Sequence, residues 1–146
     1  DVCDKLGADK KKVLKSVGGD SRIGNKYFNP GYSFGGPCFP RDTRALKQIV
    51  DSVSINSDLL VATTEYNEEH STFQTNQLLE QEKEEYVIED ICYKEGSKIP
   101  IIEESAKLKI ARNLVKAGKK VTIRDESHMI DEVIKEYGNL FEYELK

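Results

Sequence analysis

Apolar residues in the first half of the chain recur at spacings of three and four, which is the pattern of helices with one apolar face. The pattern predicts helix over residues 1–17, interrupted near Gly7, with Asp9 as the cap of a second short helix. Gly18 and Gly19 are expected to end it. The apolar positions of this region are Val2, Leu6, Val13, Leu14 and Val17.

Two longer helices are expected next. One begins at about Pro40, since proline suits a first helical turn, and its apolar face consists of Ala45, Leu46, Ile49, Val50 and Val53. The other runs over residues 58–79 and is capped by Ser57 or Asp58. Its candidate buried positions are Leu59, Leu60, Ala62, Tyr66, Phe73 and Leu78.

After the polar run 81–85, read as a linker or helix end, the pattern changes to β-α-β-α-β. Strands are predicted over 86–92 and 120–124, and helices over 101–117 and 129–137. Phe141, Tyr143 and Leu145 alternate as a half-buried final strand. Strands that alternate with helices of this length favour a parallel sheet. The predicted class is therefore α/β with an all-helical first half, followed by a partial Rossmann-like unit.

Composition limits the possible functions. Charged residues make up 33% of the chain, and the net charge is −4 with both signs interspersed, which argues against nucleic-acid binding. No run approaches 18 apolar residues, so we expect no membrane span. Three cysteines are too few for a disulfide scaffold and suggest a reducing, cytoplasmic environment. His70 and His128 lack paired cysteine spacing, so no metal site is expected. No charged-then-apolar leader follows Asp1, and this first residue hints at a longer parent chain.

Residues 18–37 form the most unusual segment. They hold six of the ten glycines and two of the four prolines, and they lack helical or strand periodicity. Long irregular loops inside a domain are usually functional when they are ordered. The aromatic residues of the segment, which include Tyr27 and Phe34, argue against simple disorder.

Cys38 lies between Pro37 and Pro40, just before the predicted helix start. Backbone N–H groups and the helix dipole favour a thiolate there, which would make Cys38 a nucleophile. Asp42 follows within the first turn, close enough to share one site. The alternative is that Cys38 is a small buried hydrophobic residue and Asp42 a favourable dipole partner. Cys3 and Cys92 are predicted to belong to the core.

The segment RIGNKYFNPGYSFGGPCFPRD (22–42) resembles the active-site loop of the UDP-glucose dehydrogenase family. These nucleotide-sugar dehydrogenases oxidise a sugar C6 alcohol to a carboxylate. The stretch DVCDKLGADKKKVLKSVGGDSRIG resembles the helices that precede the loop in that family. The stretch CYKEGSKIPIIEESAKLKIARNLVKAGKKVTIRDE resembles the opening of its C-terminal nucleotide-sugar domain. The resemblance therefore covers most of the chain.

The resemblance implies a role for each matching residue. Cys38 would capture the intermediate aldehyde as a thiohemiacetal, which becomes a thioester and is hydrolysed. Asp42 would organise the general-base and water chemistry. The residues implied in substrate binding are Tyr27, Asn29, Phe34 and Gly35 in the pocket, Arg22 reaching a partner subunit's substrate, and Lys94 from the C-terminal domain.

The same resemblance implies a domain division and partners. Residues 1–80 would be the central dimerisation domain, with the active-site loop at 18–40, and residues 81–146 a partial nucleotide-sugar-binding domain. The helix 58–79 would form a homodimer. NAD is the implied cofactor, but no G-x-G-x-x-G occurs in the sequence, so NAD would be bound mainly by a domain outside this chain.

Two hypotheses of function follow. The chain is part of an NAD-dependent UDP-sugar 6-dehydrogenase and is inactive by itself, because hydride transfer needs a cofactor held against the substrate. Alternatively, it is a non-catalytic dimerisation or nucleotide-sugar-binding module derived from that family. UDP-glucose, UDP-N-acetylmannosamine and GDP-mannose dehydrogenases share this type of loop, and the loop sequence NPGYSFGGPCFPRD favours UDP-glucose.

Overall fold

Residues Asp1–Tyr32 form a small helical unit, and Ser33–Lys146 form a second, larger one. The computed structural model describes residues 1–94, 96–97 and 99–146. In the first unit, α1 (Val2–Leu6) ends at Gly7, which has a left-handed φ of 66°. In α2 (Lys10–Gly18), the first turn is capped by the Asp9 carboxylate, which accepts the N–H groups of Lys11 and Lys12. The predicted interruption and cap are both confirmed.

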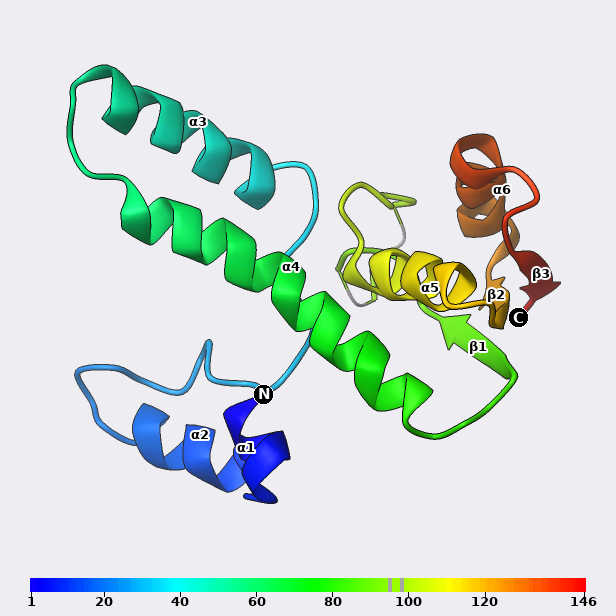
Figure 1. The fold of residues 1–146 in the computed structure, drawn as a ribbon, viewed down its shortest axis with the longest axis horizontal. Coiled ribbons are helices and arrows are strands. Elements are labelled where there is room, and N and C mark those ends of the chain that lie inside the picture. The colour runs from blue at the N-terminus through cyan, green and yellow to red at the C-terminus, as the bar shows by residue number, and fades with distance from the viewer. Residues whose placement is uncertain (95, 98) are drawn as a thin grey trace. The chain divides into compact units, whose positions relative to one another are not determined.

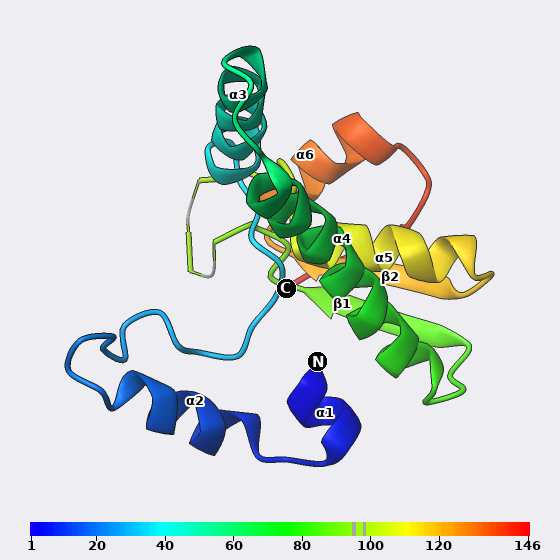
Figure 2. The same ribbon diagram turned by 60° about the vertical axis from the view of Figure 1, so that its left-hand side comes forward.

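The second unit begins with an irregular segment and two helices, α3 (Phe39–Ser52) and α4 (Asp58–Leu79). The bounds of α4 match the predicted 58–79. Figures 1 and 2 show α4 as one long helix that runs from α3 to the α/β region, and it packs against both α3 and α5. The segment that carries Cys38 leads directly into α3, so the position of α3 fixes where the thiol lies.

A parallel sheet of order β1-β2-β3 follows, formed by β1 (Glu85–Glu89), β2 (Lys120–Asp125) and β3 (Glu142–Leu145). The connecting helices are α5 (Ala106–Lys116) and α6 (Ser127–Tyr137). Their apolar faces and the buried side of β2 form the core, which includes Leu108, Ala111, Leu114, Val121, Ile123, Met129 and Val133. The predicted β-α-β-α-β unit with a parallel sheet, preceded by helices, is confirmed.

Two predicted boundaries in this region are wrong. The first strand ends at Glu89 rather than at residue 92, because Asp90 has a left-handed φ of 54° that an extended strand cannot contain. The following helix begins at Ala106 rather than at residue 101. Ser105 caps it by accepting the N–H of Leu108, and Glu104 before it is again left-handed.

The apolar face predicted for α3 is largely exposed, and that of α4 is covered only in part, with Leu78 half-buried against the core cluster. Leu46, Ile49 and Leu59 are exposed. The buried side chains of α4 are polar: Asn67, Ser71 and Thr75. Helical periodicity was correct, but it could not show which of these apolar residues another part of the same chain covers. Cys3 is half-buried rather than in the core, whereas Cys92 is half-buried against the core cluster.

The units given by the structure meet between Tyr32 and Ser33, while the domain boundary at residues 80 and 81 stays a prediction. A bilayer span needs about 20 predominantly apolar residues. Within residues 1–94, 96–97 and 99–146, a helix with that length and apolar character is not found.

Candidate active site

Gly35 and Gly36 bring the segment before Cys38 against the connection between β1 and α5. A Cβ at Gly35 would lie 2.1 Å from the carbonyl oxygen of Glu104. Gly36 has a φ of 83°, and a Cβ there would lie 2.4 Å from the ring of Tyr93. The N–H of Gly36 donates to the carbonyl of Glu103 at 3.0 Å. Glycine is therefore required at both positions by close approach.

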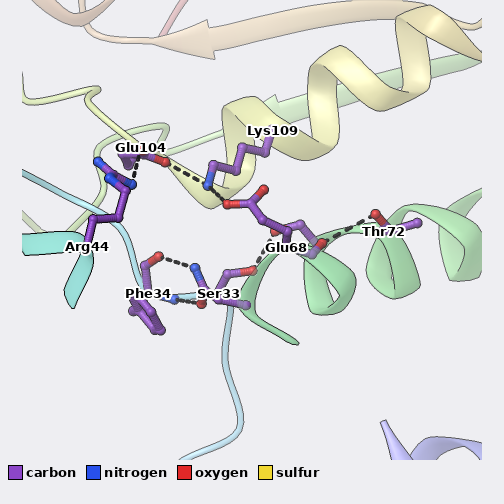
Figure 3. A network of polar contacts seen from close by, with 9 residues as sticks. Ser33, Phe34, Arg44, Glu68, Thr72, Glu104 and Lys109 are labelled. Atoms are coloured by element: carbon purple, nitrogen blue, oxygen red, sulfur yellow. Dashed lines mark hydrogen bonds and ion pairs between the residues drawn. The ribbon is translucent and has the colours of Figure 1, made fainter. Parts of the chain in front are cut away.

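The opposite side of the same segment is held by α4. The side-chain amide of Asn67 accepts the N–H of Phe34 at 2.8 Å and donates to the carbonyl of Phe34 at 2.9 Å. The hydroxyls of Ser33 and Ser71 are hydrogen-bonded to each other. Figure 3 shows these contacts between the irregular segment and the helix. Side chains of α4 thus supply the hydrogen bonds that a neighbouring strand would otherwise provide.

Cys38 is exposed and occupies the N-cap position of α3. Its carbonyl accepts the N–H of Asp42 at 2.8 Å, so the two predicted catalytic residues lie in the same helical turn. The carboxylate of Asp42 accepts a hydrogen bond from Nε of Arg41 at 2.8 Å. The interpretation of Cys38 as a buried hydrophobic residue is therefore wrong for this chain.

Arg41 brings a positive charge to this turn. Its pKa is raised above the ordinary value, first by the hydrogen bond to Asp42, then by the negative charge of Asp42, and then by that of Cys38. Arg41 belongs to the first turn of the helix that Cys38 caps. Arginine beside a cysteine is one of the environments that favour a thiolate nucleophile.

Lys94 lies beyond the carboxyl end of β1 and is exposed. It lines a cavity of about 210 Å³ together with Asp90, Asp125 and His128. Asp125 is already used structurally, because its carboxylate accepts the N–H groups of Ile91 and Glu126. Such crevices at the carboxyl ends of parallel strands commonly bind ligands. The residue before Lys94, Tyr93, has the ring that lies against Gly36, so adjacent residues of the chain contact the loop and line the cavity.

A network of ion pairs that the sequence analysis missed surrounds the loop. Lys109 of α5 contacts Glu104 at 2.8 Å and Glu68 of α4 at 2.5 Å, and Glu104 also pairs with Arg44 of α3 at 3.4 Å (Figure 3). The hydrogen bond from Lys109 is the main cause that lowers the pKa of Glu104. Burial alone would lower the pKa of Lys109, but its hydrogen bonds to Glu104 and Glu68 outweigh this and raise it.

The predicted residues Phe34, Gly35, Cys38 and Asp42 thus lie in one continuous segment of the second unit. Arg22, Tyr27 and Asn29 belong to the first unit and are exposed in it. Arg22 is paired there with Asp20, with Nη2 2.6 Å from the carboxylate. Their predicted role in binding substrate stays a prediction.

Comparisons with known proteins agree with this fold. Residues 1–69 match the model of the UDP-glucose/GDP-mannose dehydrogenase family, central domain. A solved UDP-glucose dehydrogenase from the archaeon Pyrobaculum islandicum superposes with a TM-score of 0.86 at 27% identity, over 96% of this chain and 33% of that one. A GDP-mannose dehydrogenase from Pseudomonas aeruginosa, at 22% identity and a TM-score of 0.68 over 93% of this chain and 32% of its own, shares the fold.

Curated relatives point to the same family. The UDP-glucose 6-dehydrogenase TuaD of Bacillus subtilis is 45% identical over 78 residues, which are 53% of this chain and 17% of that protein. The UDP-glucose 6-dehydrogenase of Rickettsia bellii is 33% identical over 122 residues, which are 80% of this chain and 28% of that protein. The fold is that of nucleotide-sugar dehydrogenases, from their central helices into the α/β region that follows. This chain belongs to the UDP-glucose/GDP-mannose dehydrogenase family and spans a third or less of the relatives compared.

Proposed function

We propose that this chain supplies the catalytic thiol and part of the substrate site of an NAD-dependent UDP-glucose 6-dehydrogenase. The observation that carries the proposal is the exposed Cys38 at the N-terminus of α3, at the end of a glycine segment held from two sides. The relatives named UDP-glucose 6-dehydrogenases support the reaction class. UDP-glucose is proposed as the substrate on the same ground.

In this proposal the Cys38 thiolate attacks the aldehyde carbon derived from C6. A carbon–sulfur bond forms, and the carbonyl oxygen takes up a proton to give a thiohemiacetal. Conversion to the thioester needs loss of the hydroxyl proton and transfer of a hydride to an acceptor bound outside this chain. Water then attacks the same carbon, and the sulfur leaves as thiolate while a carboxylate is released. Asp42, in the same turn as Cys38, would accept a proton from that water.

NAD would supply the hydride acceptor, but the residues of this chain do not fit a dinucleotide site. The sequence lacks G-x-G-x-x-G, and β1 is followed by Asp90, Ile91 and Cys92 rather than by a glycine-rich turn into a helix. No residue of this chain is assigned to the cofactor. We therefore expect the chain alone, mixed with NAD and UDP-glucose, to produce no NADH absorbance at 340 nm.

Substrate binding is proposed for Lys94 and for the residues that match the family loop. Phe34 and Gly35 lie in the segment that leads to Cys38, and Lys94 lies beside the cavity at the carboxyl ends of the strands. Arg22, Tyr27 and Asn29 are proposed from the family loop that they match. Protection of Cys38 from alkylation by added UDP-glucose would support this assignment, and unchanged alkylation at saturating UDP-glucose would contradict it.

The test of the thiol is its alkylation rate. Iodoacetamide labelling followed by peptide mass mapping gives separate rates for Cys38, Cys3 and Cys92 in the native and in the urea-denatured chain. An activated Cys38 reacts faster in the native chain than in the denatured one, because the N-terminus of α3 favours the thiolate. A thiol that is merely exposed reacts no faster than when denatured, and that result would overturn the proposal.

A second candidate function, a non-catalytic dimerisation module, is favoured by a different observation. α3 and α4 expose large apolar side chains, including Leu46, Ile49, Val53 and Leu59, and such patches often mark interfaces. Light scattering coupled to gel filtration measures the mass in solution. A dimer whose Cys38 is unreactive would favour the module over the enzyme.

A further inference from the structure

Asn67 lies in the middle of α4, yet its side chain serves a segment distant in sequence. It is 8% exposed, and both of its hydrogen bonds go to the backbone of Phe34, one to the N–H and one to the carbonyl. A buried amide is costly unless its donor and acceptor are satisfied. Here that requirement is met by an irregular segment, so Asn67 specifies where Phe34 lies.

The next residue of α4 reaches the other side of the same segment. Glu68 pairs with Lys109, and Lys109 pairs with Glu104. The carbonyl oxygen of Glu104 is the atom that would contact a Cβ at Gly35. The backbone of Glu104 has a left-handed φ of 52°, which is unfavourable for a glutamate. The ion pairs thus fix a strained residue against the glycine that precedes Cys38 by three positions.

Residues 33–38 are called the site loop. We propose that Asn67 and Glu68 are positioning residues for this loop, a proposal that rests on the proposed role of Cys38. Asn67 holds the loop directly through Phe34. Glu103 and Glu104 form the opposite wall of the loop, and Glu68 holds this wall through Lys109. The loop ends at the N-cap of α3, so its placement determines where the Cys38 thiol faces a substrate.

The test is Asn67→Asp, which has nearly the same shape. The introduced carboxylate still accepts the N–H of Phe34. It lacks the N–H group that Asn67 donates to the Phe34 carbonyl, and its negative charge repels that carbonyl oxygen. Burial raises the pKa of a carboxyl, and the protonated form regains a donor. The defect is therefore expected at neutral pH and is relieved in mild acid.

The primary readout is amide hydrogen exchange of Gly36, whose N–H is bonded to Glu103 and not to residue 67, measured by NMR as the ratio of variant to wild type at each pH. We expect exchange about tenfold faster at neutral pH, falling towards the wild-type rate near pH 5, because a buried acceptor loses its partner only while the carboxyl is ionised. The Cys38 alkylation rate, as the same ratio, should change over the same pH interval. The charged groups that face the loop titrate in the variant and in the wild type alike, so their effect cancels in the ratio. These groups are Glu68, Glu104, Lys109 and Arg44.

Thr75→Val is the matched control. Thr75 is buried on the same face of α4, but its hydroxyl donates to the carbonyl of Ser71 and accepts a long hydrogen bond from Asn113 of α5, and neither partner belongs to the site loop. The control should leave the Gly36 exchange ratio near one. Equal effects of both substitutions, or an effect of Asn67→Asp that does not depend on pH, would overturn the proposal.

Glu68→Gln tests the second positioning residue. It removes one charge from the pair with Lys109 and should speed Gly36 exchange more than Phe34 exchange, because Gly36 is bound to the wall that Glu104 forms. Unchanged Gly36 exchange would remove Glu68 from the proposal. The wild-type alkylation rate of Cys38 is a separate measurement, so a failure of the proposed function is distinguishable from a failure of the loop positioning.

Discussion

The α/β region from β1 onward and the helical region before it are stabilised by different kinds of side chain. In the α/β region, α5, β2 and α6 bury apolar residues such as Leu114, Ile123 and Val133 in one cluster. In the helical region, α4 buries Asn67 and Ser71 and exposes Leu59. The first region has an apolar interior, against which Leu78 and Leu79 at the end of α4 also pack. The second uses its polar contacts for placement and leaves its apolar surface available.

The largest expected effect is a loss of stability in the α/β region. Leu114 is 0% exposed, and Leu114→Ala should lower the free energy of unfolding by about 2–5 kcal/mol, because a cavity forms in a packed core. Urea denaturation followed by circular dichroism measures this. The matched control is Leu59→Ala, at a leucine 80% exposed, which should change the free energy by less than about 0.5 kcal/mol. Similar losses at both positions would remove the contrast between the regions.

The next effect concerns the exposed apolar surface of α4. If that surface covers a second copy of the chain, Leu59→Asp should weaken the dimer by about tenfold or more, since a charge would replace buried apolar area. The dimer dissociation constant, from sedimentation equilibrium, is the measurement. Thr72→Asp adds the same charge at an exposed position of α4 on a different side of the helix and should leave association unchanged. A wild-type chain that stays monomeric would refute the dimer.

A smaller effect is expected from Glu104, which joins the two regions. Its lowered pKa means that the folded state favours the ionised form. The resulting stability is therefore present above the unfolded value of 4.5 and is lost as the pH falls through the lower folded value. Glu104→Gln should cost about 1 kcal/mol at neutral pH, since the ion pairs are partly exposed.

Chemical denaturation of wild type and Glu104→Gln across acidic pH checks this sign. The difference between them should be constant near neutrality and shrink below pH 4.5. Glu103→Gln, at the exposed neighbouring acid, should change the free energy by less than about 0.5 kcal/mol. A difference that grows in acid would mean that Glu104 is not stabilised by Lys109.

The same contrast explains what the sequence could predict. Periodicity predicted α5, α6 and the strands because their apolar residues are covered within this chain. It failed for most of the faces predicted on α3 and α4, because Leu46, Ile49 and Leu59 are exposed, whereas the buried residues of α4 are Asn67, Ser71 and Thr75. These three polar residues are spaced by four, which was the available signal. The partner Phe34 could not be inferred, because that contact exists only in the tertiary structure.

The glycine and cysteine motif of the loop was easier to predict than the ion pairs that hold the loop in place. Gly35, Gly36 and Cys38 could be recognised because a glycine pair before a cysteine and a helix start is a local pattern, and the structure gives the glycines a clear steric reason. The ion-pair network of Glu104 and Lys109 includes residues from three helices far apart in sequence. Charged residues are common on any helix, so their spacing carries no information about such a network.

The smallest expected effect is at Arg41, and it tests whether the exposed site depends on charge as well as on placement. Removing the guanidinium with Arg41→Met should slow alkylation of Cys38 by about two- to fivefold, because arginine close to a cysteine is one of the environments that favour a thiolate and Arg41 lies in the turn that Cys38 caps. The effect should diminish in high salt, since exposed charges are screened. Lys47→Met serves as the control, because Lys47 lies on the same helix but pairs with Asp51 one turn away. If both variants slow Cys38 equally and independently of salt, Arg41 acts by shaping the first turn of α3, and placement alone accounts for the thiol.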